Sequence, residues 1–202
     1  MEKDNLELLA QAVLGRIFVP LEASGRHVHV TAQQAKTLFG HDLTPARELS
    51  QPGQFLAKER VTVVGPKGEF QNVAVLGPVR KAAQVEISLT DGRALGISPP
   101  VRLSGDVGHS PGCRLVGPCG SVDLAEGAIV AQRHIHLPPQ DAVRFGVQDK
   151  QVVKLQTFTT RPVVFEDVVV RISPDFAAAV HLDYDEANAC GFAKGDWGRI
   201  IP

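Results

Sequence analysis

Hydrophobic side chains recur at three- and four-residue steps near the start of the chain. Leu6, Leu9, Val13 and Ile17 belong to this series. The spacing predicts an amphipathic helix within residues 1–18, with one apolar stripe along its length. Pro20 ends the pattern. Such a helix either packs against the rest of the chain or docks on a partner surface, and the pattern leaves both interpretations open.

Beyond this segment, short aliphatic runs alternate with turns that contain glycine, proline and polar residues. Runs of this kind predict β-strands. The 19 glycines and 14 prolines of the chain favour many short strands over long helices. We therefore predict a mainly β fold with short helices. The predicted strands are Val28–Val30, Val61–Val64, Val73–Leu76, Val85–Leu89, Ala128–Ala131, Val152–Phe158, Val163–Ile172 and Ala178–Leu182.

Two stretches of the chain share one pattern. Residues 25–40 and 132–147 each contain Arg-His-aliphatic-His-aliphatic, followed by a polar turn and a short helix-like run. Residues 85–91 also match residues 180–186, and this alignment places Glu86 opposite His181. The repeats predict an internal duplication. We place the two halves at residues 19–110 and 111–202, because glycine, serine and proline cluster between them.

Each half contains a histidine pair that is suited to metal binding. Side chains alternate along a strand, so the two imidazoles of a His-x-His strand lie on one face. With the third position of the alignment, each half offers three ligands, which is typical of catalytic zinc with one open position. Ligand type alone leaves cobalt and iron open, and a carboxylate facing water is the alternative for the third position of the first half. The predicted sets are His27, His29 and Glu86, and His134, His136 and His181.

One arginine lies outside the duplicated pattern. Arg80 follows Gly77, Pro78 and Val79, and the repeat places Asp175 opposite it. The planar guanidinium group suits phosphate oxygens. Because it breaks the symmetry of the repeat, Arg80 is a candidate for substrate binding; a solvated surface position is the alternative.

Composition and charge exclude several classes of protein. A net charge of −1 gives no reason to expect a nucleic acid or an acidic membrane as partner. No apolar run approaches the roughly 18 residues that span a bilayer, and the N-terminus lacks the design of a secretory signal. The cysteines, Cys113, Cys119 and Cys190, are odd in number and lack framework spacing, which indicates reduced thiols and a cytoplasmic location.

Several sequence blocks, in the right order, resemble the PduL-type phosphotransacylases (phosphate propanoyltransferases) of bacterial microcompartments. The resemblance begins near residue 19 and continues to the end of the chain. The blocks that carry it are Ser24–Val30, Leu49–Phe55, Val64–Gly68, Val75–Arg80, Gln84–Ser88, Ser104–Asp106, Gln132–His136 and His181–Ala189.

The resemblance implies an enzyme that reversibly converts a short-chain acyl-CoA and phosphate into acyl phosphate and CoA. It implies two small β-barrel domains and two zinc ions per chain, held near the domain junction by the six residues named above. It also implies that Arg80 binds phosphate, that Ser24, Leu76 and Asn188 contact CoA, and that the N-terminal helix is an encapsulation peptide. We further expect a homo-oligomer.

Two other functions fit paired histidines. One is a zinc-dependent hydrolase, although amidohydrolases with such pairs use longer, more helical barrels. The other is a non-catalytic, zinc-stabilised interaction module. Consumption of acyl-CoA that depends on phosphate distinguishes acyl transfer from hydrolysis, and loss of activity on chelation argues against the module.

Overall fold

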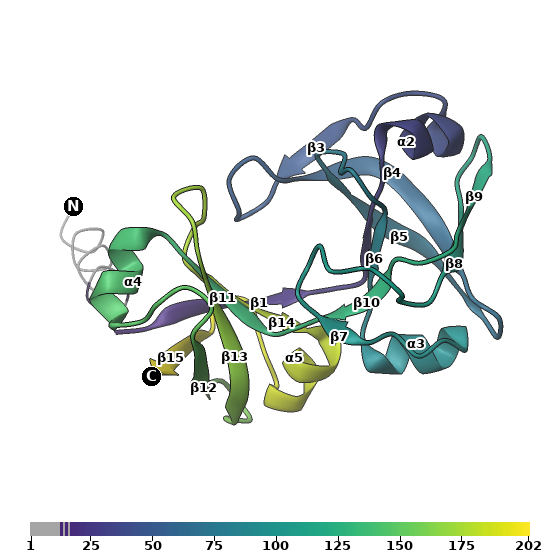
Figure 1. The fold of residues 1–202 in the computed structure, drawn as a ribbon. Helices are drawn as coiled ribbons and strands as arrows, with labels where there is room; N and C mark the ends of the chain where they lie inside the picture. The colour runs from purple at the N-terminus through teal and green to yellow at the C-terminus, as the bar shows by residue number, and fades with distance from the viewer. Residues whose placement is uncertain (1–12, 14, 16) are drawn as a thin grey trace. The chain divides into compact units, whose positions relative to one another are not determined.

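The computed structural model describes residues 13, 15 and 17–202 (Figure 1). Most of the predicted N-terminal helix therefore lies outside the described residues. The described part is mainly β, with four short helices, which confirms the predicted fold class. None of its helices is long and apolar enough to cross a membrane.

The chain forms two compact units that are not simple halves of the sequence. The first, which we call the barrel unit, contains the described residues up to 24 together with 133–182 and 186–202. The second, the sheet unit, contains residues 25–132 and 183–185. These limits differ from the boundary that we predicted between residues 110 and 111.

The barrel unit is a closed barrel of six strands in the order β1-β14-β11-β13-β12-β15. Its core consists of the aliphatic side chains that alternate inward along these strands, such as Leu21, Ile135 and Leu155. The elements are β1 (Val19–Ser24), β11 (His134–Leu137), α4 (Pro139–Phe145), β12 (Val152–Phe158), β13 (Val164–Ile172), β14 (Ala179–Asp183), α5 (Tyr184–Cys190) and β15 (Trp197–Ile201).

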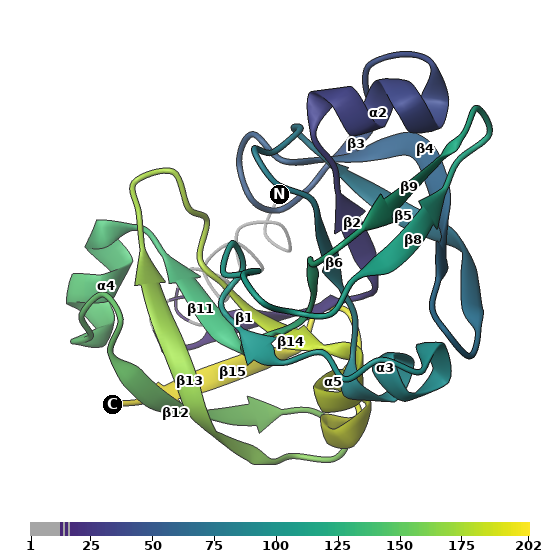
Figure 2. The same cartoon turned by 45° about the vertical axis from the view of Figure 1, so that its right-hand side comes forward.

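The sheet unit is a nine-stranded sheet that curls into a half-barrel, in the order β7-β10-β6-β2-β5-β4-β8-β9, with β3 paired to β4. Figure 2 shows α2 alongside β9 in this unit. The elements are β2 (His27–His29), α2 (Ala32–Phe39), β3 (Pro45–Glu48), β4 (Phe55–Val64), β5 (Glu69–Gly77), β6 (Gln84–Glu86), α3 (Leu89–Leu95), β7 (Val101–Arg102), β8 (Cys113–Val116), β9 (Ser121–Leu124) and β10 (Ala128–Ala131).

The helices of the sheet unit are short, and their ends are fixed by local hydrogen bonds. Thr31 and Gln34 form a capping box at the start of α2, and Ser88 and Asp91 form one at the start of α3. Such caps satisfy backbone N–H groups that lack partners in the first turn. The first turn of α3 is thereby fixed three residues after Glu86.

The predicted duplication is visible as a repeated strand order. In the sheet unit β2 pairs antiparallel with β6 and parallel with β5, and β5 pairs antiparallel with β4. In the barrel unit β11 pairs antiparallel with β14 and parallel with β13, and β13 pairs antiparallel with β12. The register sets His27 opposite Glu86 and His134 opposite His181, as the sequence alignment predicted.

Candidate functional site

The sheet unit brings together the first predicted set of ligands. His27 and His29 lie on β2 and Glu86 on β6, each no more than 8% exposed. Their ligand atoms all lie within 4.8 Å of one another. His27 Nδ1 is 2.8 Å from the carbonyl oxygen of Gly25, and His27 Nε2 is 3.5 Å from Glu86 Oε2. The main chain therefore turns the other ring nitrogen of His27 toward the carboxylate.

Burial and charge set the protonation of these groups. Burial, with the nearby His27 and Arg80, lowers the pKa of His29 to about 3. Burial alone would raise the pKa of Glu86 and lower that of His27, but their ion pair outweighs it and moves both in the opposite direction. The carboxylate is thus ionised and His29 is neutral, which are the forms that bind a metal ion.

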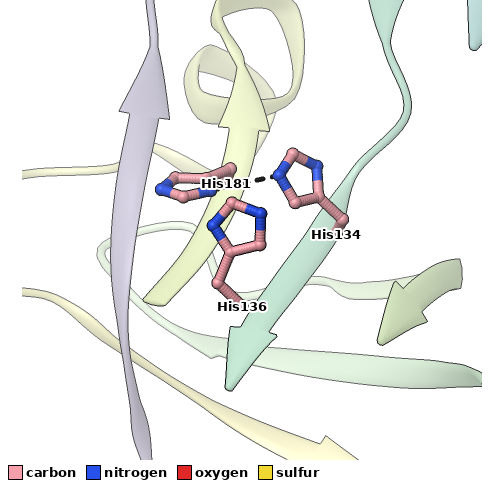
Figure 3. Close-up of side chains that lie close together, drawn as sticks. All are labelled: His134, His136 and His181. Carbon is pink, nitrogen blue, oxygen red and sulfur yellow. Dashed lines mark hydrogen bonds between the residues drawn. The ribbon is translucent and has the colours of Figure 1, made fainter. Parts of the chain in front are cut away.

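The barrel unit holds the second set in the same arrangement. His134 and His136 project from β11 and His181 from β14, and the three rings converge (Figure 3). Their ligand atoms also lie within 4.8 Å of one another, and His181 Nδ1 is 3.2 Å from His134 Nε2. Burial, with the charges of the two other rings and of Arg171, lowers the pKa of His136 to about 2. This imidazole is therefore neutral as well.

Several imidazole nitrogens in the two clusters are buried without a partner. His29 Nδ1 and both ring nitrogens of His136 have no hydrogen bond within the described part of the chain. Leaving such a group unsatisfied costs about 1–3 kcal/mol, so native proteins rarely do so. A bound metal ion would satisfy His29 Nδ1 and one of the two ring nitrogens of His136.

The spacing of the donor atoms also suits a metal ion. Two ligand atoms bound to one zinc ion at ~2.0–2.1 Å with tetrahedral angles lie about 3.3–3.4 Å apart. One pair in each cluster lies near this spacing: His181 Nδ1 and His134 Nε2 are 3.2 Å apart, and His27 Nε2 and Glu86 Oε2 are 3.5 Å apart. Both clusters therefore offer the donor chemistry of a divalent-ion site, with one pair of donors in each at a suitable spacing.

Arg80 lies beside the sheet-unit cluster and is tied to it by a hydrogen-bond network. Arg80 Nη1 is 3.2 Å from Ser104 Oγ, and Ser104 Oγ is 3.0 Å from Glu86 Oε1. The buried side chain of Gln84 donates to Glu86 and to Ser104, and it accepts from the Gly105 N–H at 2.7 Å. The network holds Glu86 Oε1 and leaves Oε2 facing His27.

The arginine that precedes each histidine pair bonds to the helix that follows the third ligand. Arg26 makes two hydrogen bonds to Asp91 in α3, of 3.1 and 2.8 Å, and stacks 4.0 Å from the centre of the Phe70 ring. Arg133 bonds to Glu186 in α5 at 2.7 Å. Asp91 and Glu186 each lie five positions after the third ligand, so the repeat preserves this contact as well.

The residues predicted to contact CoA belong to different units. Ser24 ends β1 and is half-buried, and Asn188 is exposed on α5; both belong to the barrel unit. Leu76 is half-buried on β5 of the sheet unit. Contact of these three residues with CoA stays a prediction.

The buried cysteines are poor nucleophiles. Burial raises the pKa of Cys113 to about 11, and burial also raises the pKa of Cys190. Only the thiolate reacts readily, so neither side chain is prepared for covalent catalysis.

Comparison with known proteins shows which family this sequence resembles. The family model described as phosphate propanoyltransferase matches residues 20–193. Proteins named phosphate propanoyltransferase are 55% identical over 206 residues in Enterococcus faecalis (98% of each chain) and 53% identical over 198 residues in Listeria monocytogenes (97% of this chain, 93% of the relative). One from Thermotoga maritima is 52% identical over 181 residues (88% and 86%).

Matches of this extent define the class of protein: the chain is a phosphotransacylase, an enzyme that transfers acyl groups to or from phosphate. Within that class it belongs to the phosphate propanoyltransferase family. The resemblance that its sequence motifs indicated is thereby confirmed.

Proposed function

We propose that the chain reversibly converts a short-chain acyl-CoA and inorganic phosphate into acyl phosphate and CoA. The observation that carries this proposal is the identity above 50% with phosphate propanoyltransferases over nearly the whole chain. We propose further that each cluster holds one divalent ion, zinc in the first place, through His27, His29 and Glu86 and through His134, His136 and His181.

The reaction needs no covalent acyl-enzyme. An oxygen of phosphate forms a bond to the thioester carbonyl carbon, the carbon–sulfur bond breaks, and CoA leaves as a thiolate that takes up a proton. The raised pKa values of Cys113 and Cys190 support this direct route, because no buried thiol is activated to accept the acyl group first.

The protein's own groups bind and orient the reactants. Arg80, held by Ser104, offers a planar fork that neutralises and aims the phosphate. Ser24, Leu76 and Asn188 are proposed to hold CoA, so that the thioester meets the phosphate in a fixed geometry. Bound divalent ions would supply Lewis-acid polarisation of phosphate and carbonyl oxygens.

A thiol-release assay tests the proposal. Purified enzyme is given acetyl-, propionyl- or butyryl-CoA with and without phosphate, and the same sample is analysed for metal. We expect thiol release that requires phosphate, is lost on chelation and returns with zinc while the circular dichroism spectrum is unchanged. Release without phosphate would indicate a zinc hydrolase instead. A folded, metal-loaded chain that releases no thiol with any of the three substrates would overturn the proposal.

We also propose that residues 1–18 direct the enzyme into a bacterial microcompartment. The support is the apolar stripe of the N-terminal sequence together with the resemblance to microcompartment enzymes. Fusing residues 1–18 to a fluorescent protein in cells that assemble such compartments should give punctate fluorescence. A diffuse signal, equal to that of a fusion in which Leu6 and Leu9 are replaced by Glu, would contradict this placement.

A further inference from the structure

The two clusters differ in the charge of their ligands. The sheet-unit cluster includes the carboxylate of Glu86, whereas the ligands of the barrel-unit cluster are three imidazoles. A carboxylate nevertheless reaches the second cluster from β1. Glu22 Oε2 lies 3.1 Å from His181 Nε2.

We propose that Glu22 is a positioning residue of the barrel-unit centre. It fixes the tautomer of His181 so that Nδ1 faces the metal ion, and it supplies the negative charge that Glu86 supplies directly in the other centre. This inference rests on the proposed function, in which both clusters hold a metal ion.

The hydrogen bond determines which ring nitrogen of His181 is available. A carboxylate only accepts, so the proton of a neutral His181 lies on Nε2, and the lone pair lies on Nδ1. His181 Nδ1 is the atom that lies 3.2 Å from His134 Nε2, inside the cluster (Figure 3). The arrangement is that of a metal-bound histidine whose other nitrogen donates to a carboxylate.

The sheet unit performs the same orientation with a neutral group. There the carbonyl oxygen of Gly25 accepts from His27 Nδ1 at 2.8 Å and leaves Nε2 for the cluster. A carbonyl adds no charge, but Glu86 already provides one. Each centre would thus combine a divalent ion with one carboxylate, bound directly in the sheet unit and acting through His181 in the barrel unit.

The alternation of side chains along the barrel strands places Glu22 on the side of the histidines. Leu21 and Val180 are buried in the barrel core, so their neighbours Glu22 and His181 project to the opposite face. The His181 side chain is 14% exposed and that of Glu22 35% exposed. At this depth the contact is screened less by solvent than a contact between fully exposed groups.

Titration with Co²⁺ alone, followed by its visible absorption, tests the role of Glu22 in the full-length chain. Loss of one binding step in His136→Ala identifies the barrel-unit centre. Glu22→Gln retains an acceptor oxygen and loses the charge, and Glu22→Ala loses both. Removing an outer partner of a metal ligand typically weakens binding 10–100-fold. At this step alone, we expect the dissociation constant for cobalt to rise about 10-fold in Glu22→Gln and toward about 100-fold in Glu22→Ala.

Glu166→Gln is the matched control, because it removes a carboxylate from the same barrel that pairs with Lys154 rather than with a cluster. It should bind cobalt like the wild type, with the same absorption spectrum. Wild-type affinity and spectrum at the barrel-unit centre in both Glu22 variants would overturn the inference while leaving the proposed function intact. A wild-type chain that binds no cobalt would overturn both the inference and the metal sites of the proposed function.

Discussion

At the scale of single residues, His136 is the proposed ligand whose polar atoms the protein itself satisfies least. Its ring is 6% exposed, stacks on Phe176 with centroids 3.9 Å apart, and has no hydrogen bond at either nitrogen within the described residues. A buried imidazole of this kind lowers stability by about 1–3 kcal/mol unless something binds it. Binding of a ligand to one of these nitrogens would remove part of this cost.

Replacing His136 by Leu should have opposite effects with and without metal. In metal-free protein we expect His136→Leu to be at least as stable as the wild type, because an unsatisfied polar group is removed. With excess Zn²⁺ the wild type should gain stability by mass action, and the variant should gain clearly less. Urea unfolding of both proteins, with and without zinc, measures this. His41→Leu, at an exposed position, is the control. If His136→Leu lowered the free energy of unfolding equally with and without zinc, the expectation would be contradicted.

Arg80 gives a second prediction at this scale. Arg80→Ala removes charged hydrogen bonds to phosphate, each worth about 1.5–3 kcal/mol, so the kcat/KM for phosphate should fall about 10- to 100-fold. The KM for phosphate should rise and kcat should fall. Metal content should not change, because Arg80 is not one of the proposed ligands. Arg47→Ala, an exposed arginine of the same unit, serves as control. Unchanged phosphate kinetics in Arg80→Ala would remove Arg80 from the mechanism.

The same residues show how far the sequence predicts the site. All six proposed ligands follow from the period of two along strands and from the repeat. The sequence could also have predicted that Gln84 lies beside the first cluster, because it is two positions before Glu86 and so shares its face of the strand. Glu22 and Ser104 could not, because they reach the clusters from segments whose pairing depends on the tertiary fold.

At the scale of elements, the repeated arginine links the strand of the histidine pair to the helix after the third ligand. Asp91, which pairs with Arg26, also belongs to the capping box of α3. The contact thus fixes the start of α3 relative to β2. Glu186 and Arg133 repeat the contact between α5 and β11. This explains why the duplication preserves an arginine as well as two histidines.

Breaking this contact should destabilise the sheet unit. In Arg26→Ala the buried carboxylate of Asp91 loses a charged partner, and we expect a loss of about 1–3 kcal/mol in the free energy of unfolding. Arg114→Ala is a matched control, because Arg114 makes an equally close two-bond pair with Asp123 in water. Exposed pairs contribute little, so Arg114→Ala should cost clearly less. Chemical unfolding measures both, and equal losses would contradict the role assigned to Arg26.

At the scale of the whole molecule, the division of the chain could not be predicted from the sequence. The strand periodicity and the repeat predicted a mainly β, duplicated protein, and both features are present. However, β1 precedes the first histidine pair in sequence and completes the barrel that contains the second. Likewise β8, β9 and β10 follow residue 110 yet belong to the sheet unit. Such long-range pairing leaves no signal in local periodicity.

This connectivity predicts which fragment of the chain folds as the barrel unit. Residues 133–202 lack β1, which joins β14 to β15 in the closed barrel, so we expect this fragment to be unfolded or aggregated because its strand edges are open. Pro20 lies opposite Trp197 in an antiparallel pair, so β1 can follow β15 in a hairpin. Adding residues 17–24 after Pro202 through a short Gly-rich loop should therefore restore the barrel.

Near-ultraviolet circular dichroism, dispersed amide resonances and cooperative unfolding distinguish the two fragments. The same added segment with Val19 and Leu21 replaced by Asp is the control, because both side chains are buried in the barrel core. It should fail to restore folding, since burying an unpaired charge costs far more than one strand can contribute. A fragment 133–202 that folds cooperatively without β1, or a permuted fragment that remains unfolded, would show that the barrel is not the autonomous unit that its strand order indicates.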